Sequence, residues 1–167
     1  MKPVDFCDTI IFGGTFDPPH NGHLDCLRYA EKVCQFKSIV VVPVGKPVTF
    51  QKKTKVPWFS FEERFKMCEV LFLQHFQTTK SVLISDIENR LPKPSYTRET
   101  IKHFIKESPK DRRWAFLLGA DQFVSLMDWE GWQGILQDVS LFVVRRGSLE
   151  GKSYDFSKAV SQISEKS

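Results

Sequence analysis

Short apolar runs recur along this chain, and most of them end at a glycine, a proline or an arginine. Five runs have the length of a strand and lie at residues 9–12, 38–42, 81–84, 114–118 and 139–144. They are apolar on both faces, which is the pattern of strands in a parallel sheet that helices cover on either side. The pattern therefore predicts five buried strands.

Apolar residues at helical spacing lie between these runs, in the segments 24–34, 61–72 and 101–105. Ser60 and Glu63 stand at capping-box spacing before the second segment, and Thr97 is expected to cap the third helix. Alternating strands and helices predict an α/β fold with a Rossmann-like, doubly wound, mainly parallel five-stranded sheet flanked by helices. We expect one folded domain over residues 1–147 and a short polar tail over 148–167.

Composition narrows the class of protein. With 167 residues, 41% hydrophobic and 26% charged, the chain fits one soluble globular domain. No apolar run approaches the roughly 18 residues that a membrane span needs, and the N-terminus lacks the pattern of a signal peptide. We therefore expect a cytoplasmic protein with no membrane partner. The net charge of +4 favours anionic metabolites and is too diffuse to indicate nucleic acid.

The four cysteines are interpreted as small core residues rather than as reactive thiols or metal ligands. They are Cys7, Cys26, Cys34 and Cys68. None of them belongs to a CxxC pair, and each has apolar neighbours. The aromatic residues likewise follow core periodicity, which disfavours an RNA-binding stacking platform.

The segment after the first apolar run carries unusual residues. Gly13 and Gly14 allow the backbone to approach a ligand closely. His20 and His23 are three residues apart at a predicted helix start, so both rings can face one point together with the N–H groups of the first turn. This combination predicts a phosphate site. Two alternatives stay open: a glycine-rich turn with two surface histidines, and a zinc site that lacks a third ligand nearby.

The segment Gly-Gly-Thr-Phe-Asp-Pro-Pro-His-Asn-Gly-His, residues 13–23, resembles the signature of the nucleotidylyltransferase superfamily. The resemblance implies that His20 and His23 are catalytic and contact the phosphates of ATP. It also implies an ATP and phosphate site that contains Gly13, Gly14, Thr15, Phe16 and Gly22. This motif alone does not choose between adenylyl- and cytidylyltransferases.

Two later segments resemble nicotinate-nucleotide adenylyltransferases more specifically. Pro-Ser-Tyr-Thr at 94–97 is similar to the segment that lines the pyridine pocket of that family, which implies that Ser95, Tyr96 and Thr97 bind the substrate. A hydroxyl helix cap with a surface tyrosine is the alternative.

Asp121 and Trp129 form the second such segment, with Gly119 before them. The resemblance implies that Asp121 binds ribose hydroxyls and that Trp129 stacks on the pyridine ring. Both roles are physically reasonable, because a carboxylate accepts from neighbouring hydroxyls and an indole covers a flat ring. Trp132 competes for the stacking role, because the two tryptophans would share a face of one helix.

Basic residues complete the expected phosphate site. Arg145-Arg146-Gly147 follows the fifth run and resembles the family's Arg-Arg-Pro-Gly, with Arg146 assigned to phosphate although the proline is missing. Lys46, in the loop 44–58, is also assigned to phosphate. Thr49 stands in this loop where the family has a histidine, and the loop is long enough to be a mobile lid.

The residues near the C-terminus depart most from the family. Where it carries Ile-Ser-Ser-Thr-x-x-Arg, this chain has Ile163-Ser164-Glu165 and no following arginine. Either the chain is short relative to the working enzyme, or its handling of ATP is changed or lost. Because the arginine that holds phosphate in the family is absent and a glutamate is added, we expect weak ATP binding.

The resemblance implies adenylyl transfer from ATP to nicotinic acid mononucleotide, in a nucleotidyltransferase domain over 1–147. Mg²⁺ is expected as cofactor, held by ATP phosphates and water, with no protein metal site. The expected partners are ATP and the mononucleotide, with no nucleic acid, and the sequence leaves a homo-oligomer open. The alternatives are adenylyl transfer to phosphopantetheine or nicotinamide mononucleotide, and a degenerate non-catalytic nucleotide-binding protein.

Overall fold

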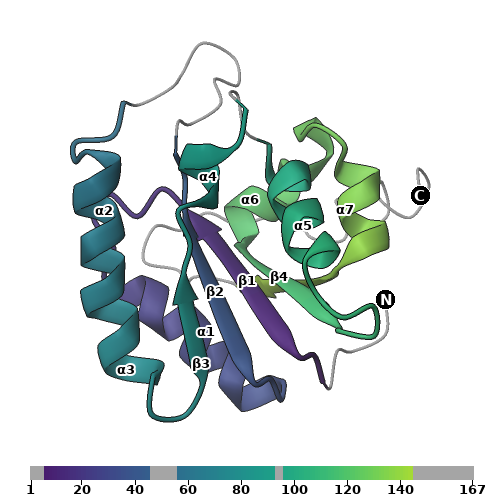
Figure 1. The fold of residues 1–167 in the computed structure, drawn as a ribbon, viewed down its shortest axis with the longest axis horizontal. Coiled ribbons are helices and arrows are strands. Elements are labelled where there is room, and N and C mark those ends of the chain that lie inside the picture. Colours follow the sequence, from purple (N-terminus) through teal and green to yellow (C-terminus); the bar gives the residue numbers. More distant parts are fainter. Residues whose placement is uncertain (1–5, 46–55, 93–95, 145–167) are drawn as a thin grey trace.

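The structure is a computed structural model that describes residues 6–45, 56–92 and 96–144. Five parallel strands form one sheet. The strands are β1 (Thr9–Gly14), β2 (Ser38–Pro43), β3 (Ser81–Ile84), β4 (Trp114–Gly119) and β5 (Ser140–Val144). Their order across the sheet is β3-β2-β1-β4-β5, and every neighbouring pair is parallel (Figure 1). The predicted Rossmann-like sheet is confirmed.

One face of the sheet is covered by α1 (Asn21–Val33) and by a long helical segment. That segment consists of α2 (Phe61–Cys68), the π-helical turn η1 (Glu69–Leu73) and α3 (Gln74–Phe76). The core on this face includes Ile10, Phe12, Leu24, Leu27, Cys68 and Phe72. The apolar stripes predicted for these two segments are the faces that pack on the sheet.

The opposite face is covered by shorter helices (Figure 1). They are α4 (Ile87–Arg90), α5 (Thr97–Lys106), α6 (Ala120–Val124), the 3-10 turn η2 (Leu126–Asp128) and α7 (Trp132–Asp138). The core on this face includes Ile11, Val40, Ile101, Phe116, Trp132 and Ile135. Helices cover both faces of the sheet, and β1, β2 and β4 are buried on both sides, as their sequences require. The prediction of a buried strand is wrong for β3, which lies at the edge of the sheet and has Ser81 and Leu83 exposed.

Two capping predictions have different outcomes. The Ser60–Glu63 capping box is present, because the Ser60 hydroxyl accepts from the Glu63 N–H and the Glu63 carboxylate accepts from the Ser60 N–H. The prediction that Thr97 caps α5 is wrong, since the helix begins at Thr97, and Tyr96 occupies the capping position without a side-chain bond. A β-region backbone at Tyr96 is enough to start this helix.

All four cysteines are buried and none of them forms a disulfide, as expected of core residues. Burial raises the pKa of the Cys7 and Cys68 thiols to about 12, which keeps both thiols protonated. No helix in the described part of the chain has the length and apolar character needed to cross a membrane.

The strand order determines which loops meet. β1 lies between β2 and β4, with Gly14 opposite Pro43 on one side and Phe12 opposite Leu117 on the other. The chain proceeds outward from β1 to β2 and β3, and then returns to β4 beside β1. The direction of winding therefore reverses between β1 and β4, and a ligand site is expected at their carboxyl ends.

Candidate active site

The turn after β1 contains a strained residue. Phe16 has a φ of 49°, in the left-handed region, and its side chain is 1% exposed. Such a conformation in a residue other than glycine costs roughly 1–3 kcal/mol and persists where the surroundings enforce it. The ring is held edge-on by Phe12 at 5.4 Å and by Phe72 at 5.6 Å, and it meets the His23 ring at 4.9 Å between centroids. The buried ring thus anchors the turn directly before α1.

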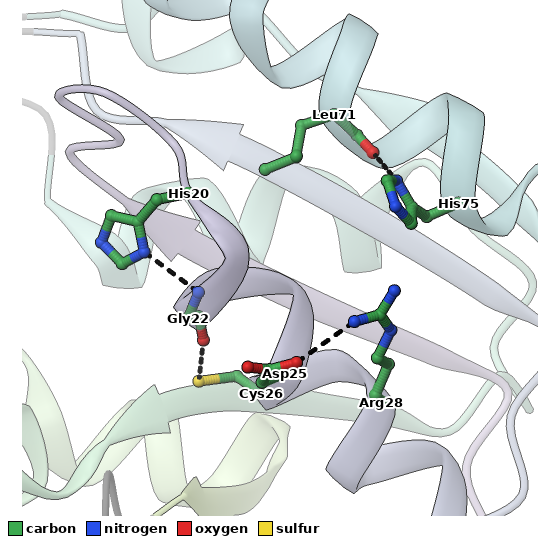
Figure 2. A network of polar contacts seen from close by, with 7 residues as sticks. All are labelled: His20, Gly22, Asp25, Cys26, Arg28, Leu71 and His75. Atoms are coloured by element: carbon green, nitrogen blue, oxygen red, sulfur yellow. Dashed lines mark hydrogen bonds and ion pairs between the residues drawn. The ribbon is translucent and has the colours of Figure 1, made fainter.

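His20 and His23 form the N-terminal cap of α1. Nδ1 of His20 accepts from the Gly22 N–H at 3.1 Å, as Figure 2 shows, and Nδ1 of His23 accepts from the His20 N–H at 3.1 Å. A neutral imidazole that accepts at Nδ1 carries its proton on Nε2. The cap therefore leaves both rings with a proton donor at Nε2.

The two imidazoles converge, as the spacing of the histidines predicted. Their ring centroids are 3.9 Å apart, with 38° between the ring planes. They stand at the N-terminus of a helix whose first turn has no acidic residue. The positive end of the helix dipole and the two ring donors make this point favourable for an anion.

The sequence suggested that the Gly22 amide faces a phosphate, but in the structure this amide has a protein partner. It donates to His20, and the Gly22 carbonyl accepts from the Cys26 thiol at 3.2 Å (Figure 2). An amide that caps its own helix is not available to bind a phosphate, so the first turn presents fewer N–H groups than we expected.

A cavity of ≈ 270 Å³ opens between the turn after β1 and the turn after β4. Its lining includes Gly13, Gly14, Thr15, Phe16, His20, His23 and Asp121. Gly119 precedes α6, and its N–H donates to Oε1 of Gln122 at 3.2 Å, which orders the start of the helix that carries Asp121. The structure thus brings a carboxylate and two imidazoles to one cavity, although about 100 residues separate them along the chain.

Other predicted substrate residues lie outside the lining of this cavity. Tyr96 and Thr97 stand at the start of α5. Trp129 is half-buried and meets the Phe116 ring edge-on at 6.2 Å. The expectation that Trp129 and Trp132 share one helix face is wrong, because Trp129 follows η2, and Gly131, with a φ of 66°, turns the chain before α7 begins.

Several predicted residues fall outside the described part of the chain. They are Lys46, Ser95 and Arg146, together with most of the loop 44–58 and the segment 163–165.

Asp17 is a residue of the cavity lining to which the sequence analysis gave no role. Its carboxylate accepts from the N–H groups of Trp58 at 2.7 Å and Phe59 at 3.0 Å. Desolvation opposes ionisation of this carboxyl, but the two backbone hydrogen bonds and the nearby Arg64 outweigh it and lower the pKa of Asp17. The carboxylate therefore ties the turn after β1 to the residues before α2.

Arg64 is a second residue that sequence reasoning missed. It is 1% exposed and lies on α2. A signal was available, because Arg64 is three residues after Phe61 and four before Cys68, which places a charge on the apolar stripe of the helix. A charged residue in such a position needs buried hydrogen-bond partners.

The described residues contain no group of three or more histidine, cysteine, aspartate or glutamate side chains that could hold a metal ion. Asp17 uses its carboxylate for backbone N–H groups. A Mg²⁺ ion that phosphate oxygens and water coordinate would not need such a group of side chains.

The chain is similar to known proteins in sequence. Residues 11–164 match the cytidylyltransferase-like family. The probable nicotinate-nucleotide adenylyltransferase of Leptospira interrogans is 35% identical over 144 residues, which cover 85% of this chain and 68% of the relative. The protein of that name from Desulfotalea psychrophila is 31% identical over 139 residues, which cover 81% of this chain and only 62% of the relative.

The fold is also similar to that of a solved protein. The nicotinic acid mononucleotide adenylyltransferase of Plasmodium falciparum, complexed with APC, has a TM-score of 0.70 at 16% sequence identity. The match covers 93% of this chain and 70% of that protein. At this identity the similarity concerns the fold.

Proposed function

Because this chain belongs to the cytidylyltransferase-like family, we propose that it transfers the adenylyl group of ATP to nicotinic acid mononucleotide. The products are deamido-NAD and pyrophosphate, which makes this a step of NAD biosynthesis. The names of the two curated relatives support this choice of substrates.

The observation that carries the proposal is the cavity that joins His20, His23 and Asp121. The two imidazoles and the N-terminus of α1 suit a polyphosphate, whereas the carboxylate of Asp121 suits the hydroxyls of a sugar. A ligand that carries both a ribose and a phosphate suits such a cavity, and a nucleotide combines the two.

The reaction requires no base from the protein. The phosphate of the mononucleotide is ionised near neutral pH, and one of its oxygens attacks the α-phosphorus of ATP. The bond from the α-phosphorus to the bridging oxygen breaks, and pyrophosphate leaves with the electron pair. The site contributes by aligning two anions and by stabilising charge as it develops on the phosphate oxygens.

The hydrogen bonds of the histidine cap determine which ring nitrogens can donate to the substrates. With Nδ1 of each ring accepting a backbone N–H, the Nε2 protons are the ones that donate to ATP phosphates. The packing of Phe16 against the His23 ring keeps that donor oriented. His20 and His23 therefore act as preorganised donors rather than as an acid–base pair.

The pyridine end of the substrate is assigned to residues around α5 and η2. We assign ribose binding to Asp121, stacking on the pyridine ring to Trp129, and pocket contacts to Tyr96 and Thr97. Trp129 is half-buried on the same side of the sheet as α5, and Asp121 lies on the helix that precedes η2. Mononucleotide contacts would then extend outward from the cavity along this face.

Mg²⁺ would arrive with ATP, held by phosphate oxygens and water, and would neutralise part of the phosphate charge. We further propose that the enzyme works in the cytoplasm, which is supported by four buried cysteines that form no disulfide.

A pyrophosphate-release assay tests the function. The chain is supplied with ATP and Mg²⁺ and, in separate reactions, with nicotinic acid mononucleotide, nicotinamide mononucleotide or phosphopantetheine. We expect release with nicotinic acid mononucleotide at the highest kcat/KM. A preference for either other acceptor would reassign the substrate. Absence of release with all three, combined with tight nucleotide binding, would indicate a non-catalytic binding protein.

Calorimetry with each ligand alone tests the balance between the two substrates. We expect the mononucleotide to bind more tightly than ATP, because Glu165 stands where the family's C-terminal motif has a serine, and a carboxylate there would repel the ATP phosphates. Micromolar affinity for ATP would show that Arg146, Lys46 or other basic residues replace that motif. Absence of mononucleotide binding would remove the substrate assignment.

A further inference from the structure

The guanidinium of Arg64 connects the turn after β1, which lines the cavity, to two further segments. Its Nη1 donates to the Thr15 carbonyl at 2.6 Å, and its Nη2 donates to the Val44 carbonyl at 2.9 Å. Its Nε donates to the Phe59 carbonyl at 3.2 Å. The turn after β1, the end of β2 and the start of α2 therefore meet at one side chain.

All three hydrogen-bond acceptors of Arg64 are backbone carbonyls, and Arg64 therefore links backbone segments to one another. Burial lowers the pKa of the guanidinium, and the negative charge of Asp17 nearby opposes that effect. The planar fork of an arginine can direct several N–H groups along fixed lines, so three carbonyls in different segments are held in one geometry. A lysine has a single charged point and cannot reproduce this arrangement.

Asp17 forms a second link in the opposite direction. Its carboxylate, on the turn, accepts from the N–H groups of Trp58 and Phe59, which lie directly before the Ser60 cap of α2. Thr15 and Asp17 stand on either side of Phe16, and both are bonded to the start of α2. These hydrogen bonds hold the backbone of Phe16 in its left-handed conformation, which is unfavourable for a residue other than glycine.

We propose that Arg64 is a positioning residue for adenylyl transfer: it holds the Thr15 carbonyl, thereby sets the conformation of Phe16, and through Phe16 orients His23 and His20 over the cavity. The path is continuous, because the Phe16 ring contacts the His23 ring and the His23 ring accepts from the His20 N–H. The kinetic part of this inference rests on the proposed function, whereas the geometric part holds without any substrate.

The test compares Arg64→Lys with Lys66→Met, which alters an exposed charge on the same helix. Histidine ring signals are recorded by NMR on the full chain without ligand. The chain has four histidines, so His75 and His103 serve as internal references. We expect Arg64→Lys to shift the signals of His20 and His23 and to leave those of His75 and His103 in place. We expect kcat to fall about tenfold to 10²-fold, with a smaller change in KM.

The outcomes separate the positioning role from the proposed function. Unchanged His20 and His23 signals in a folded Arg64→Lys protein would overturn the proposal, and so would equal shifts in Lys66→Met. Shifted signals in a chain that releases no pyrophosphate even as wild type would support the positioning role while refuting the activity.

A further variant keeps the test decisive if the first variant misfolds. If Arg64→Lys does not fold, Asp17→Asn decides, because it replaces one of the two acceptor oxygens with an NH2 group and so weakens the second link at a site that is only half-buried. We expect it to shift the same two histidine signals. Signals identical to those of the wild type would then overturn the proposal.

Discussion

The backbone N–H of His20 donates to Nδ1 of His23, while the two rings lie 3.9 Å apart. One pair of residues thus both starts α1 and presents two donors to the cavity. A substitution at either position therefore affects stability and activity by separate routes, and these routes can be measured separately.

His20→Asn retains a side chain suited to the start of a helix but removes the imidazole donor. We expect kcat to fall on the order of 10²-fold or more, because a preorganised donor to the reacting phosphates is lost, with little change in Tm. His20→Ala should show the same loss of activity and a further destabilisation of about 1 kcal/mol, from the lost cap. Steady-state kinetics and thermal unfolding measure the two effects.

His23→Ala should likewise reduce kcat on the order of 10²-fold or more. His75→Gln, on the exposed side of α3, is the matched control and should keep wild-type rates. Wild-type turnover in folded His20→Asn and His23→Ala proteins would contradict the assignment of both donors.

Asp121→Asn tests the sugar side of the cavity. Asp121 is exposed, so the substitution should leave Tm unchanged. We expect the KM for the mononucleotide to rise about 10- to 100-fold, since hydrogen bonds to a charged group are worth about 1.5–3 kcal/mol. Asp128→Asn, another exposed carboxylate close by along the chain, is the control. An unchanged KM would show that Asp121 does not bind ribose.

Trp129→Ala should weaken binding of the mononucleotide more than binding of ATP, by about 1–3 kcal/mol if base stacking is a fair guide. Because Trp129 also packs on Phe116, the alanine variant loses some stability as well. Trp129→Phe retains an aromatic face and should recover most of the affinity. Calorimetry with each ligand measures the difference, and equal losses for both ligands would argue against stacking.

Trp132→Phe is tested in parallel. Trp132 is the first residue of α7 and is buried in the core, so we expect an effect on Tm and little effect on ligand affinity. The opposite result would transfer the stacking role from Trp129 to Trp132.

Asp17 makes a pH-dependent contribution to stability. Its pKa is lowered from the ordinary value of 3.8 in the folded state, so the stabilisation is fully present above that ordinary value. It is lost as the pH falls through the lower folded pKa. Asp17→Asn should therefore be less stable than wild type at pH 7, and the difference should shrink below pH of about 4. Urea unfolding across this range measures it, and a difference independent of pH would exclude the carboxylate as its source.

Local patterns in the sequence determined a large part of this protein. Five short runs of consecutive apolar residues predicted five strands, because strands in a parallel sheet that helices cover carry such runs. The spacing of His20 and His23 predicted their convergence, since residues three apart at a helix start share a face. The Ser60–Glu63 box was likewise readable, because both of its hydrogen bonds close within three residues.

The arrangements that bring together segments far apart in the sequence were determined by the tertiary structure. Asp121 lines the same cavity as the histidines because β4 returns beside β1, and strand order is set by packing of the whole sheet rather than by any local pattern. The partners of Arg64 are similarly invisible in the sequence, because two of its three carbonyls come from other segments.

Backbone geometry also overrode local expectations at short range. Trp129 and Trp132 were separated by the turn at Gly131, and the Gly22 amide was taken by the His20 ring. In both cases the sequence spacing predicted which residues could meet along an ideal helix. The point at which the helix begins determined which of them did, because capping bonds and a left-handed glycine fix that point in three dimensions.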